Sequence, residues 1–385
     1  MPALNERLQA VARDLESKFL GRSEVVRCML VSALAGEHLV LIGPPGTAKS
    51  ALVRTFSKLC DARYFEYLLT RFTEPNELFG PVDIAAFREG TYRRRTAGML
   101  PEGEIVFLDE VFKSNSAILN SLLTLLNERR YVSGGVTLEC PLLTAIGASN
   151  EVPADADLAA IFDRFLLRVR TDYLDAFHFQ DLLQRGWELE AKLTTQKTTP
   201  LLSADELRAA QRAIAQRTQF TDTFLSAYRS LVLQIRAEGI GLSDRRVVKL
   251  LKLCAASAFL DGRTAPDASD LFVLQHVWNA EDQAAILQGL VQPVLEAHYR
   301  EHPETRRLGA AAVGLPAIEA EIERVRVVLA GTGALSDVQL FAQLRLLGEL
   351  KTALSSQPEA KARELAQRVD VLLDAAFKGG RFGAL

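Results

Sequence analysis

Hydrophobic residues in the first half of the chain occur in short continuous runs, and helical patterns separate these runs. The runs predict buried strands at residues 38–42, 64–69, 105–108, 142–148 and 165–169. Between them, helices are predicted at residues 50–59, 114–127 and 155–162. In the second of these helices, Ile118, Leu122 and Leu126 follow the four-residue spacing of one helix face. Strands that are apolar throughout are typical of parallel sheets covered by helices on both faces. The first half therefore predicts an α/β fold around a parallel five-stranded sheet.

The strand pattern ends near Thr195, and only helical patterns follow. Ser203 and Glu206 form a capping-box sequence at the start of one helix, and Leu202 and Leu207 flank it as a hydrophobic staple. Further helices are predicted at residues 223–237, 244–260, 268–279 and 282–299. The second part of the chain is therefore expected to be all-helical.

A polar stretch that contains Pro303 interrupts the helical pattern. One helix face after it is lined by Ile318, Ile322, Val325 and Leu329. Two more helices are predicted to begin near Ser336 and Pro358. These breaks predict three domains, namely an α/β core at residues 1–195, a helical domain at 196–303 and a C-terminal helical bundle at 304–385.

The composition is that of an ordinary globular protein, with 48% hydrophobic and 24% charged residues. The net charge of −3 argues against a surface devoted to nucleic acid or to an acidic membrane. No apolar run approaches the roughly 18 residues of a membrane span, and the opening MPALNERLQA predicts an amphipathic helix, unlike a signal peptide. The four cysteines are widely separated, which argues against a disulfide or zinc framework. We therefore expect a cytoplasmic protein.

The most informative segment is GPPGTAKS, residues 43–50, which directly follows one predicted strand and precedes a helix. This is the context of a phosphate-binding loop. Gly43 and Gly46 allow backbone N–H groups to turn toward a phosphate, and the helix N-terminus adds free donors. Lys49 can reach the β- and γ-phosphates, and the Ser50 hydroxyl can bind Mg²⁺. Ala48 replaces the usual second glycine, and we expect helix-compatible angles there.

A second motif, IVFLDE, is an apolar strand that ends in two acids. Asp109 at the end of this strand can hold the hydration shell of Mg²⁺, and Glu110 can polarise the water that attacks the γ-phosphate. Asn150 ends the strand-like LLTAIGASN, which we expect to run parallel to the Asp109 strand. Its amide can orient that water or contact the γ-phosphate; alternatively, it is a turn residue before Pro153.

Two arginines are candidates for stabilising negative charge during phosphate transfer. Arg164 follows the helix predicted at residues 155–162. Arg245 lies at the start of the helix predicted at 244–260, where a positive charge is unfavourable unless an anion is close. Arg245 is therefore a candidate nucleotide sensor, although an isolated arginine is more often solvated or structural.

Together these segments resemble the AAA+ ATPases, specifically the MoxR group and, within it, the RavA type. The resemblance rests on the order and spacing of GPPGTAKS, TRFTEPNELFGP, IVFLDE, LLTLLNER, ASNEVP and DRF, and it extends over residues 15–263. It implies an AAA+ core followed by a helical lid at residues 196–303. RavA-type proteins also carry a β-rich domain after the lid, which the helical pattern of residues 303–385 does not match.

The resemblance also implies roles for individual residues. Thr47, Lys49 and Ser50 become contacts of ATP or ADP, Asp109 the acid of the Mg²⁺ site and Glu110 the catalytic base. Asn150 becomes the sensor 1 residue, Arg164 the arginine finger for the neighbouring subunit's nucleotide, and Arg245 the sensor 2 arginine of the lid. The pair Arg129 and Arg130 competes with Arg164 for the finger role.

Such proteins form hexameric rings with ATP at the subunit interfaces. The family also has an insertion in its second helix and a hairpin before sensor 1, here residues 82–99 and 130–141, which would face the ring axis. The resemblance implies chaperone-like remodelling of a partner protein that contains a von Willebrand factor A domain.

Other interpretations stay open at this point. A nucleic-acid motor is one, although the net charge and the lack of an appended DNA-binding motif argue against it. A scaffold that assembles on ATP binding is another, and a metal chelatase or a Rubisco-activase-like remodeller would use the same ATPase. The basic run at residues 92–96 is better explained as a solvated hairpin tip or a charge cluster at a ring interface than as a nucleic-acid contact. His298 and His302 share a helix face, but no third metal ligand accompanies them.

Overall fold

The computed structural model describes residues 2–153, 155, 158–174, 198–302, 305, 315–330 and 360–379, with residues 182–183, 186–187 and scattered positions between 340 and 354. The chain forms two compact units. The first consists of Met1–Tyr173 and Ala191–Arg307, and the second of Leu174–Glu190 and Leu308–Leu385.

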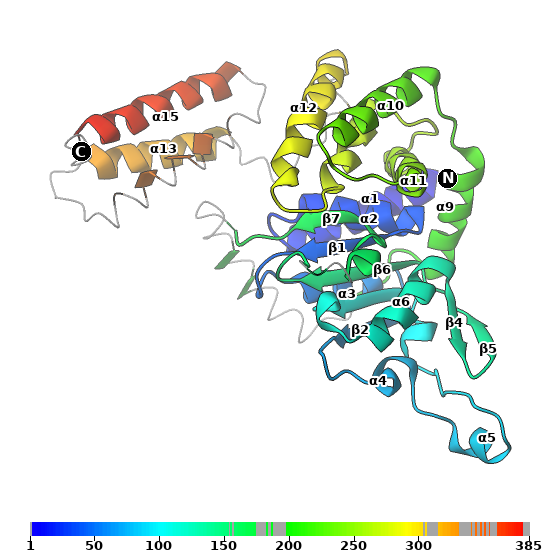
Figure 1. The fold of residues 1–385 in the computed structure, drawn as a ribbon. Coiled ribbons are helices and arrows are strands. Elements are labelled where there is room, and N and C mark those ends of the chain that lie inside the picture. The colour runs from blue at the N-terminus through cyan, green and yellow to red at the C-terminus, as the bar shows by residue number, and fades with distance from the viewer. Residues whose placement is uncertain are drawn as a thin grey trace. The chain divides into compact units, whose positions relative to one another are not determined.

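A five-stranded parallel sheet forms the centre of the first unit, in the strand order β2-β3-β6-β1-β7 (Figure 1). Its strands are β1 (His38–Ile42), β2 (Tyr64–Leu68), β3 (Ile105–Asp109), β6 (Thr144–Ser149) and β7 (Phe165–Arg170). All five residues of β1 are buried, as expected for a strand covered on both faces. The predicted parallel five-stranded sheet is confirmed.

Helices pack against this sheet. Helix α2 (Ser23–Ala35) packs against β1, β6 and β7, and α3 (Lys49–Leu59) packs against β2 and β3. Helix α1 (Pro2–Lys18) packs on α2 and α3, while α6 (Ser116–Glu128) connects β3 to a hairpin. The helix predicted at residues 155–162 is wrong in length, because only α7 (Ala159–Phe162) is α-helical among the described residues there.

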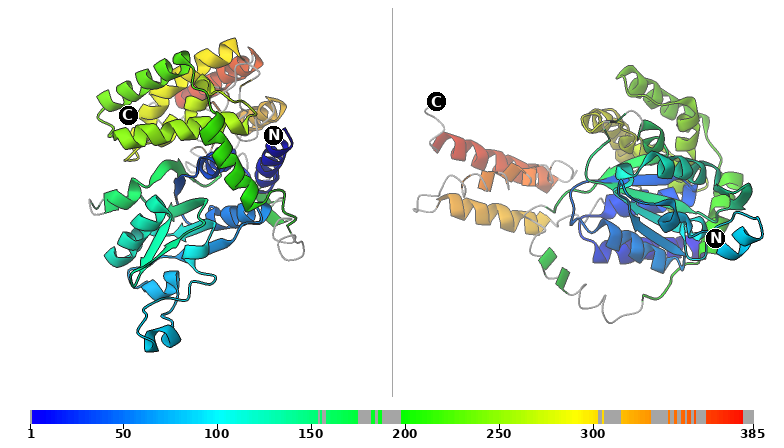
Figure 2. Two further views of the ribbon diagram at one scale, coloured as in Figure 1. Left: turned by 90° about the vertical axis from the view of Figure 1, so that its right-hand side faces the viewer. Right: turned by 60° about the horizontal axis from the view of Figure 1, so that its bottom comes forward.

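Two insertions extend from the sheet. The first contains α4 (Pro75–Phe79), α5 (Ile84–Arg88) and the 3₁₀ helix η1 (Leu100–Glu102), and the second is the hairpin β4 (Arg130–Ser133) and β5 (Val136–Glu139). They lie at the end of the unit opposite the helices α10 to α12 (Figures 1 and 2). At Gly134, which has a φ of +58°, an added Cβ would lie 2.2 Å from the backbone oxygen of Tyr92. The hairpin turn therefore lies directly against the first insertion.

The helical part of the first unit consists of α9 (Ala204–Arg217), α10 (Asp222–Ala237), α11 (Asp244–Leu260), η5 (Ala268–His276) and α12 (Gln283–Glu301). The capping box of Ser203 and Glu206 is present at the start of α9. Residues 268–276 form a 3₁₀ helix and not the predicted longer helix to residue 279. Helix α11 packs on α2, which attaches this helical part to the α/β sheet.

The second unit contains α13 (Leu315–Ala330) and α15 (Ala360–Gly379), which pack around an apolar core. Ile318, Ile322 and Val325 are buried in this core and Leu329 packs beside them, so the predicted helix face is confirmed. The expected break at Pro303 and the helix starts near Ser336 and Pro358 lie outside the described residues. So do the domain boundaries expected at 195–196 and 303–304, which stay predictions.

Within the residue ranges that the structure describes, no helix has both the length and the apolar sequence that a membrane span requires.

Candidate nucleotide-binding site

The loop between β1 and α3 is enclosed by the ends of neighbouring strands. The Gly43 N–H donates to the Ser149 carbonyl at the end of β6, at 3.0 Å. A Cβ added to Gly43 would lie 2.3 Å from the backbone oxygen of Thr171, directly after β7. Glycine is therefore required at position 43, because a side chain there would clash with the backbone that directly follows β7. Gly46, in contrast, has a φ of +80° and no neighbouring atom within 4 Å of an added Cβ.

Ala48 is the residue that caps the N-terminus of α3, and its backbone is left-handed, with φ +62° and ψ +24°. The expectation of helix-compatible angles at this position is wrong. A left-handed conformation costs an L-residue with a Cβ about 1–2 kcal/mol. The usual glycine at this position would avoid this strain, and the alanine keeps the loop geometry at an energetic cost.

The Lys49 side chain lies across its own loop. Its Nζ donates to the backbone oxygens of Gly43 and Pro44, at 2.8 and 2.9 Å, and lies 3.4 Å from Thr47 Oγ1. Burial lowers the pKa of the Lys49 ammonium, and the nearby carboxylates of Asp109 and Glu110 oppose this shift. The ammonium group is thus held between the loop and the two acids, where a phosphate group can replace the carbonyl contacts. Thr47 is buried, and Ser50 is half-buried in the first turn of α3.

Asp109 and Glu110 lie at the carboxyl end of β3. Burial raises the pKa of the Asp109 carboxyl, while the Glu110 amide and Lys49 lower it and the Glu110 and Glu66 carboxylates raise it. A partly buried acid beside other acids is a suitable ligand for a divalent cation, because the cation would compensate the carboxylate charges. The side chains of Ser50 and Asp109 are thus of the oxygen-donor type that Mg²⁺ requires.

Glu110 has an unusual backbone and an unusual set of contacts. Its φ of +51° lies in the left-handed region, which non-glycine residues rarely adopt outside functional sites. One carboxylate oxygen, Oε1, accepts from Asn150 Nδ2 at 2.7 Å and lies 3.0 Å from Lys113 Nζ. The other, Oε2, is buried and has no hydrogen-bond partner within the described part of the chain. A buried acceptor without a partner costs free energy, which is typical of a group prepared for a ligand.

Asn150 meets Glu110 because β3 and β6 are parallel neighbours. Leu108 pairs with Gly147, so both strands end at the same edge of the sheet, as expected from the sequence. Lys113 was not predicted as a site residue. It lies one turn after Glu110, and a lysine three residues after a strand-end acid was the only signal for it.

Arg164 and Arg245 lie at the opposite end of the sheet, where the strands begin. Arg164 directly precedes β7, whose first residue Phe165 pairs with His38 at the start of β1. Arg245 Nη2 donates to Asn127 Oδ1 near the end of α6, at 2.9 Å. Burial lowers the pKa of Arg164, and the positive charge of Arg245 lowers it further. The structure thus brings these two arginines together and does not bring either to the loop at residues 43–50.

The arginine pair lies where β1 begins, and the loop lies where β1 ends. The backbone of β1 spans about 13 Å or more between these two points. In this structure Arg245 contacts Asn127, and its expected role as the sensor 2 arginine of the lid stays a prediction. The distance follows from the position of α11, which begins beside the amino edge of the sheet.

Arg129 and Arg130 have partners within their own chain. Arg129 Nη2 donates to the Gly36 carbonyl at 2.6 Å, its Nη1 lies 2.6 Å from the imidazole nitrogen Nε2 of His38, and burial lowers its pKa. Arg130 Nε donates to Glu139 Oε1 across the hairpin, at 2.8 Å. Arg164 differs from both, because its Nε is buried and has no hydrogen-bond partner among the residues that are described.

The basic run at residues 92–96 pairs with its own insertion. Arg93 and Arg95 lie 3.5 and 3.6 Å from the Asp83 carboxylate, and Arg94 Nη1 donates to the Gly80 carbonyl at 2.7 Å. His298 and His302 have ring centroids 4.9 Å apart. Among the residues that the structure describes, no group of three metal-binding side chains was found.

Comparison with known proteins identifies the family. Residues 6–212, more than half of the chain, match the model of a MoxR domain in the MoxR-vWA-beta-propeller ternary systems. The chain belongs to the MoxR family of AAA+ ATPases. Residues 225–291 of this MoxR protein also match an AAA lid domain, and this range includes α11 with Arg245.

Relatives of this MoxR protein include archaeal and bacterial chains. The uncharacterized protein MJ0812 of Methanocaldococcus jannaschii is 38% identical over 280 residues, which cover 72% of each chain. Chaperone MoxR1 of Mycobacterium tuberculosis is 22% identical over 243 residues, or 62% of each chain. The crystal structure of a candidate ATPase from Cytophaga hutchinsonii has a TM-score of 0.60 at 20% identity, and the match covers 76% of this chain and 94% of that one. This last likeness shows a shared AAA+ fold.

Proposed function

We propose that this MoxR protein binds ATP with Mg²⁺ in the loop at residues 43–50 and hydrolyses it. The observation that carries the proposal is the cluster at the carboxyl edge of the sheet, where Lys49, Asp109, Glu110 and Asn150 meet. The buried Glu110 Oε2, which lacks a partner among the described residues, points to a ligand at this position. These groups are the ones that phosphoanhydride hydrolysis requires.

Each residue has one task in this proposal. Lys49 exchanges its contacts with the Gly43 and Pro44 carbonyls for phosphate oxygens. Ser50 and Asp109 would hold Mg²⁺, which would neutralise charge on the phosphates when bound. Glu110 accepts a proton from the attacking water, and Asn150 holds the Glu110 carboxylate through its 2.7 Å hydrogen bond.

We further propose that the active site is completed by a second copy of the chain. Arg164 and Arg245 lie at the amino ends of the strands, and the loop at residues 43–50 lies at their carboxyl ends. One chain therefore cannot bring them together without a large rearrangement. Head-to-tail contacts between copies would place this pair beside the neighbour's γ-phosphate. Contacts of this kind close into a ring, which the resemblance to MoxR proteins suggests is a hexamer.

The use of ATP hydrolysis is proposed to be remodelling of a partner with a von Willebrand factor A domain. The matching family model describes ternary systems that contain such a domain, and one relative is named a chaperone. We propose a RavA-like type within the family on the order and spacing of the six segments that carry the resemblance.

Two substitutions test the ATPase directly. We expect Lys49→Ala to lose ATP binding, because the ammonium contact to the phosphates is removed. Glu110→Gln should keep binding within about twofold and reduce turnover by about 100-fold or more, because it keeps the Asn150 contact and removes the base. Isothermal calorimetry and phosphate release measure the two effects, with Lys58→Ala, in the last turn of α3, as the matched control. Turnover of Glu110→Gln at the unsubstituted rate would overturn the assignment of the base.

The partner is tested with the same variant. Glu110→Gln loaded with ATP should retain a purified von Willebrand factor A domain protein on a column, because the ATP-bound state persists. Lys49→Ala is the control that never reaches this state. Equal retention by both variants would contradict an ATP-dependent partner.

A further inference from the structure

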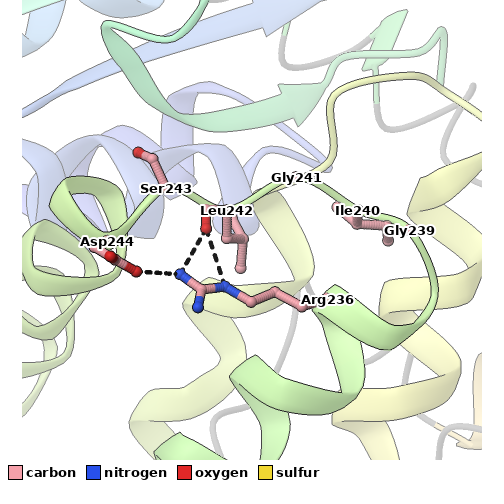
Figure 3. A pocket seen from close by; sticks show the side chains of 7 residues that line it. All are labelled: Arg236, Gly239, Ile240, Gly241, Leu242, Ser243 and Asp244. Carbon is pink, nitrogen blue, oxygen red and sulfur yellow. Dashed lines mark hydrogen bonds and ion pairs between the residues drawn. The ribbon is translucent and has the colours of Figure 1, made fainter.

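The start of α11 is fixed by arginines on two sides. Arg236 donates from Nε and Nη2 to the Leu242 carbonyl, at 3.0 and 2.7 Å, and from Nη2 to Asp244 Oδ1, at 2.7 Å. Figure 3 shows this contact. The loop at residues 239–243 lines a hollow of about 560 Å³ beside it. Arg236 thus holds the loop that leads into Arg245 from its exposed side.

Arg246 holds the same loop from its buried side. Its side chain is only 3% exposed. Its Nη2 donates to the Val277 carbonyl at 2.8 Å, and its Nη1 donates to Asn279 Oδ1 at 2.8 Å and to the Gly241 carbonyl of the loop at 3.4 Å. These acceptors are neutral, so they satisfy the donors of the guanidinium without compensating its charge.

The charge that faces Arg246 belongs to Asp163. Asp163 Oδ1 lies 3.9 Å from Arg246 Nε, a nitrogen that is buried and has no hydrogen-bond partner in the described residues. Burial lowers the pKa of Arg246 to about 10, and Asp163 opposes the shift. The other oxygen of this carboxylate, Oδ2, accepts from Arg164 Nη1 at 3.3 Å. One acid therefore lies between the buried arginine of the lid and the candidate arginine finger of the core.

We infer that Arg246 is a positioning residue for hydrolysis in the neighbouring subunit. It orients Arg164 through the Asp163 carboxylate, which lies between the two guanidinium groups. This inference rests on the proposed function, in which Arg164 and Arg245 act on the neighbour's nucleotide. A lysine cannot replace Arg246. The planar guanidinium donates in three directions, to Gly241, Asn279 and Val277, whereas a lysine offers a single point charge.

Three variants of the full chain test the inference. Arg246→Met keeps most of the buried volume, removes the charge and leaves the loop at residues 43–50 intact. We expect its turnover to fall about 10- to 100-fold, since a displacement of about 1 Å in a catalytic group has this effect, while its Kd for ATP stays within about twofold. Arg246→Lys should not restore turnover. Arg236→Met is the matched control, because it loosens the same loop without touching Asp163, and its turnover should fall less than about threefold.

A double-substitution cycle separates positioning from general destabilisation. Asp163→Asn should reduce turnover about as much as Arg246→Met, and the double variant should lose no more than either single one, since both act through one contact. All rates are measured well below each variant's Tm. Multiplicative losses, a weakened Kd for ATP, or an equal loss in Arg236→Met would overturn the inference.

Comparison with Arg164→Ala distinguishes a failure of the positioning inference from a failure of the proposed function. If Arg164→Ala lowers turnover and Arg246→Met does not, the positioning inference fails and the proposed function stands. If Arg164→Ala leaves turnover unchanged, the proposed use of the arginine pair is itself wrong.

Discussion

Single residues at the nucleotide loop show what a motif leaves unspecified. The sequence predicts the loop, its lysine and its two acids, because these residue types are required by phosphate chemistry at a strand end. It does not predict that Ala48 has a φ of +62°, since backbone angles depend on how β1 and α3 are joined. It also does not predict Lys113, whose contact with Glu110 depends on the 3₁₀ turn that follows the strand.

The strain at Ala48 leads to a stability prediction. Replacement by glycine removes a left-handed alanine, which gains about 1–2 kcal/mol, and adds freedom to the unfolded chain, which costs about 0.4–1 kcal/mol. We therefore expect Ala48→Gly to leave the free energy of unfolding unchanged or to raise it by up to about 1.6 kcal/mol.

Urea unfolding of the nucleotide-free protein measures this change. Two controls have the opposite expectation. Ala51→Gly, in the first turn of α3, should lose about 1 kcal/mol of stability, and Gly46→Ala should lose a similar amount, because its φ of +80° strains any side chain. A loss in Ala48→Gly as large as in Ala51→Gly would contradict the strain.

Whole elements were predictable where one face is apolar and the other polar. Helices α10 and α11 fit this rule, and the strands of the sheet fit the rule of continuous apolar runs. All of them lie within a few residues of their predicted bounds. Helix α2 was missed because it is buried on most of its surface, so its sequence has no polar face to mark the helix period. The type of η5 was missed because a 3₁₀ helix and an α-helix share the same composition at this length.

One buried acid beside the sheet pairs with two lysines of α11. Glu37, directly before β1, has a side chain that is 4% exposed, and it accepts from Lys249 Nζ at 2.6 Å and Lys252 Nζ at 2.9 Å. Removing both lysines leaves a buried carboxylate without these two counter-charges. We expect Lys249→Met with Lys252→Met to lower the free energy of unfolding by about 3–5 kcal/mol.

Adding Glu37→Gln to this pair provides the internal control. The triple variant should recover much of the lost stability, because no uncompensated charge remains. Denaturant unfolding measures all combinations. If the triple variant is less stable than the double one, the lysines act through packing and not through the charge of Glu37.

At the scale of the whole molecule, the sequence did not predict that Arg245 lies at the same end of the sheet as Arg164, where the strands begin. That position depends on how α11 packs on α2 and on the contact of Arg245 with Asn127, which joins residues 118 positions apart. The result is an asymmetric chain, with the proposed phosphate-binding groups where the strands of its sheet end and two arginines where the strands begin. Two copies joined head to tail would each complete one site, so incomplete copies should be able to complement one another.

Mixing two inactive variants tests this asymmetry. Lys49→Ala keeps Arg164 and cannot bind ATP, whereas Arg164→Ala binds ATP and lacks the arginine. We expect each alone to be inactive and an equal mixture to recover up to about a quarter of the unsubstituted turnover, since one interface in four pairs an intact loop with an intact arginine if the copies mix at random. As a control, Arg164→Ala is mixed with the double variant Lys49→Ala, Arg164→Ala. The double variant supplies no arginine, so this mixture should give no recovery. Recovery should appear on the time scale of subunit exchange, measured by phosphate release after mixing. If the mixture stays inactive although fluorescence energy transfer shows that the copies exchange, the arginine does not act across the interface.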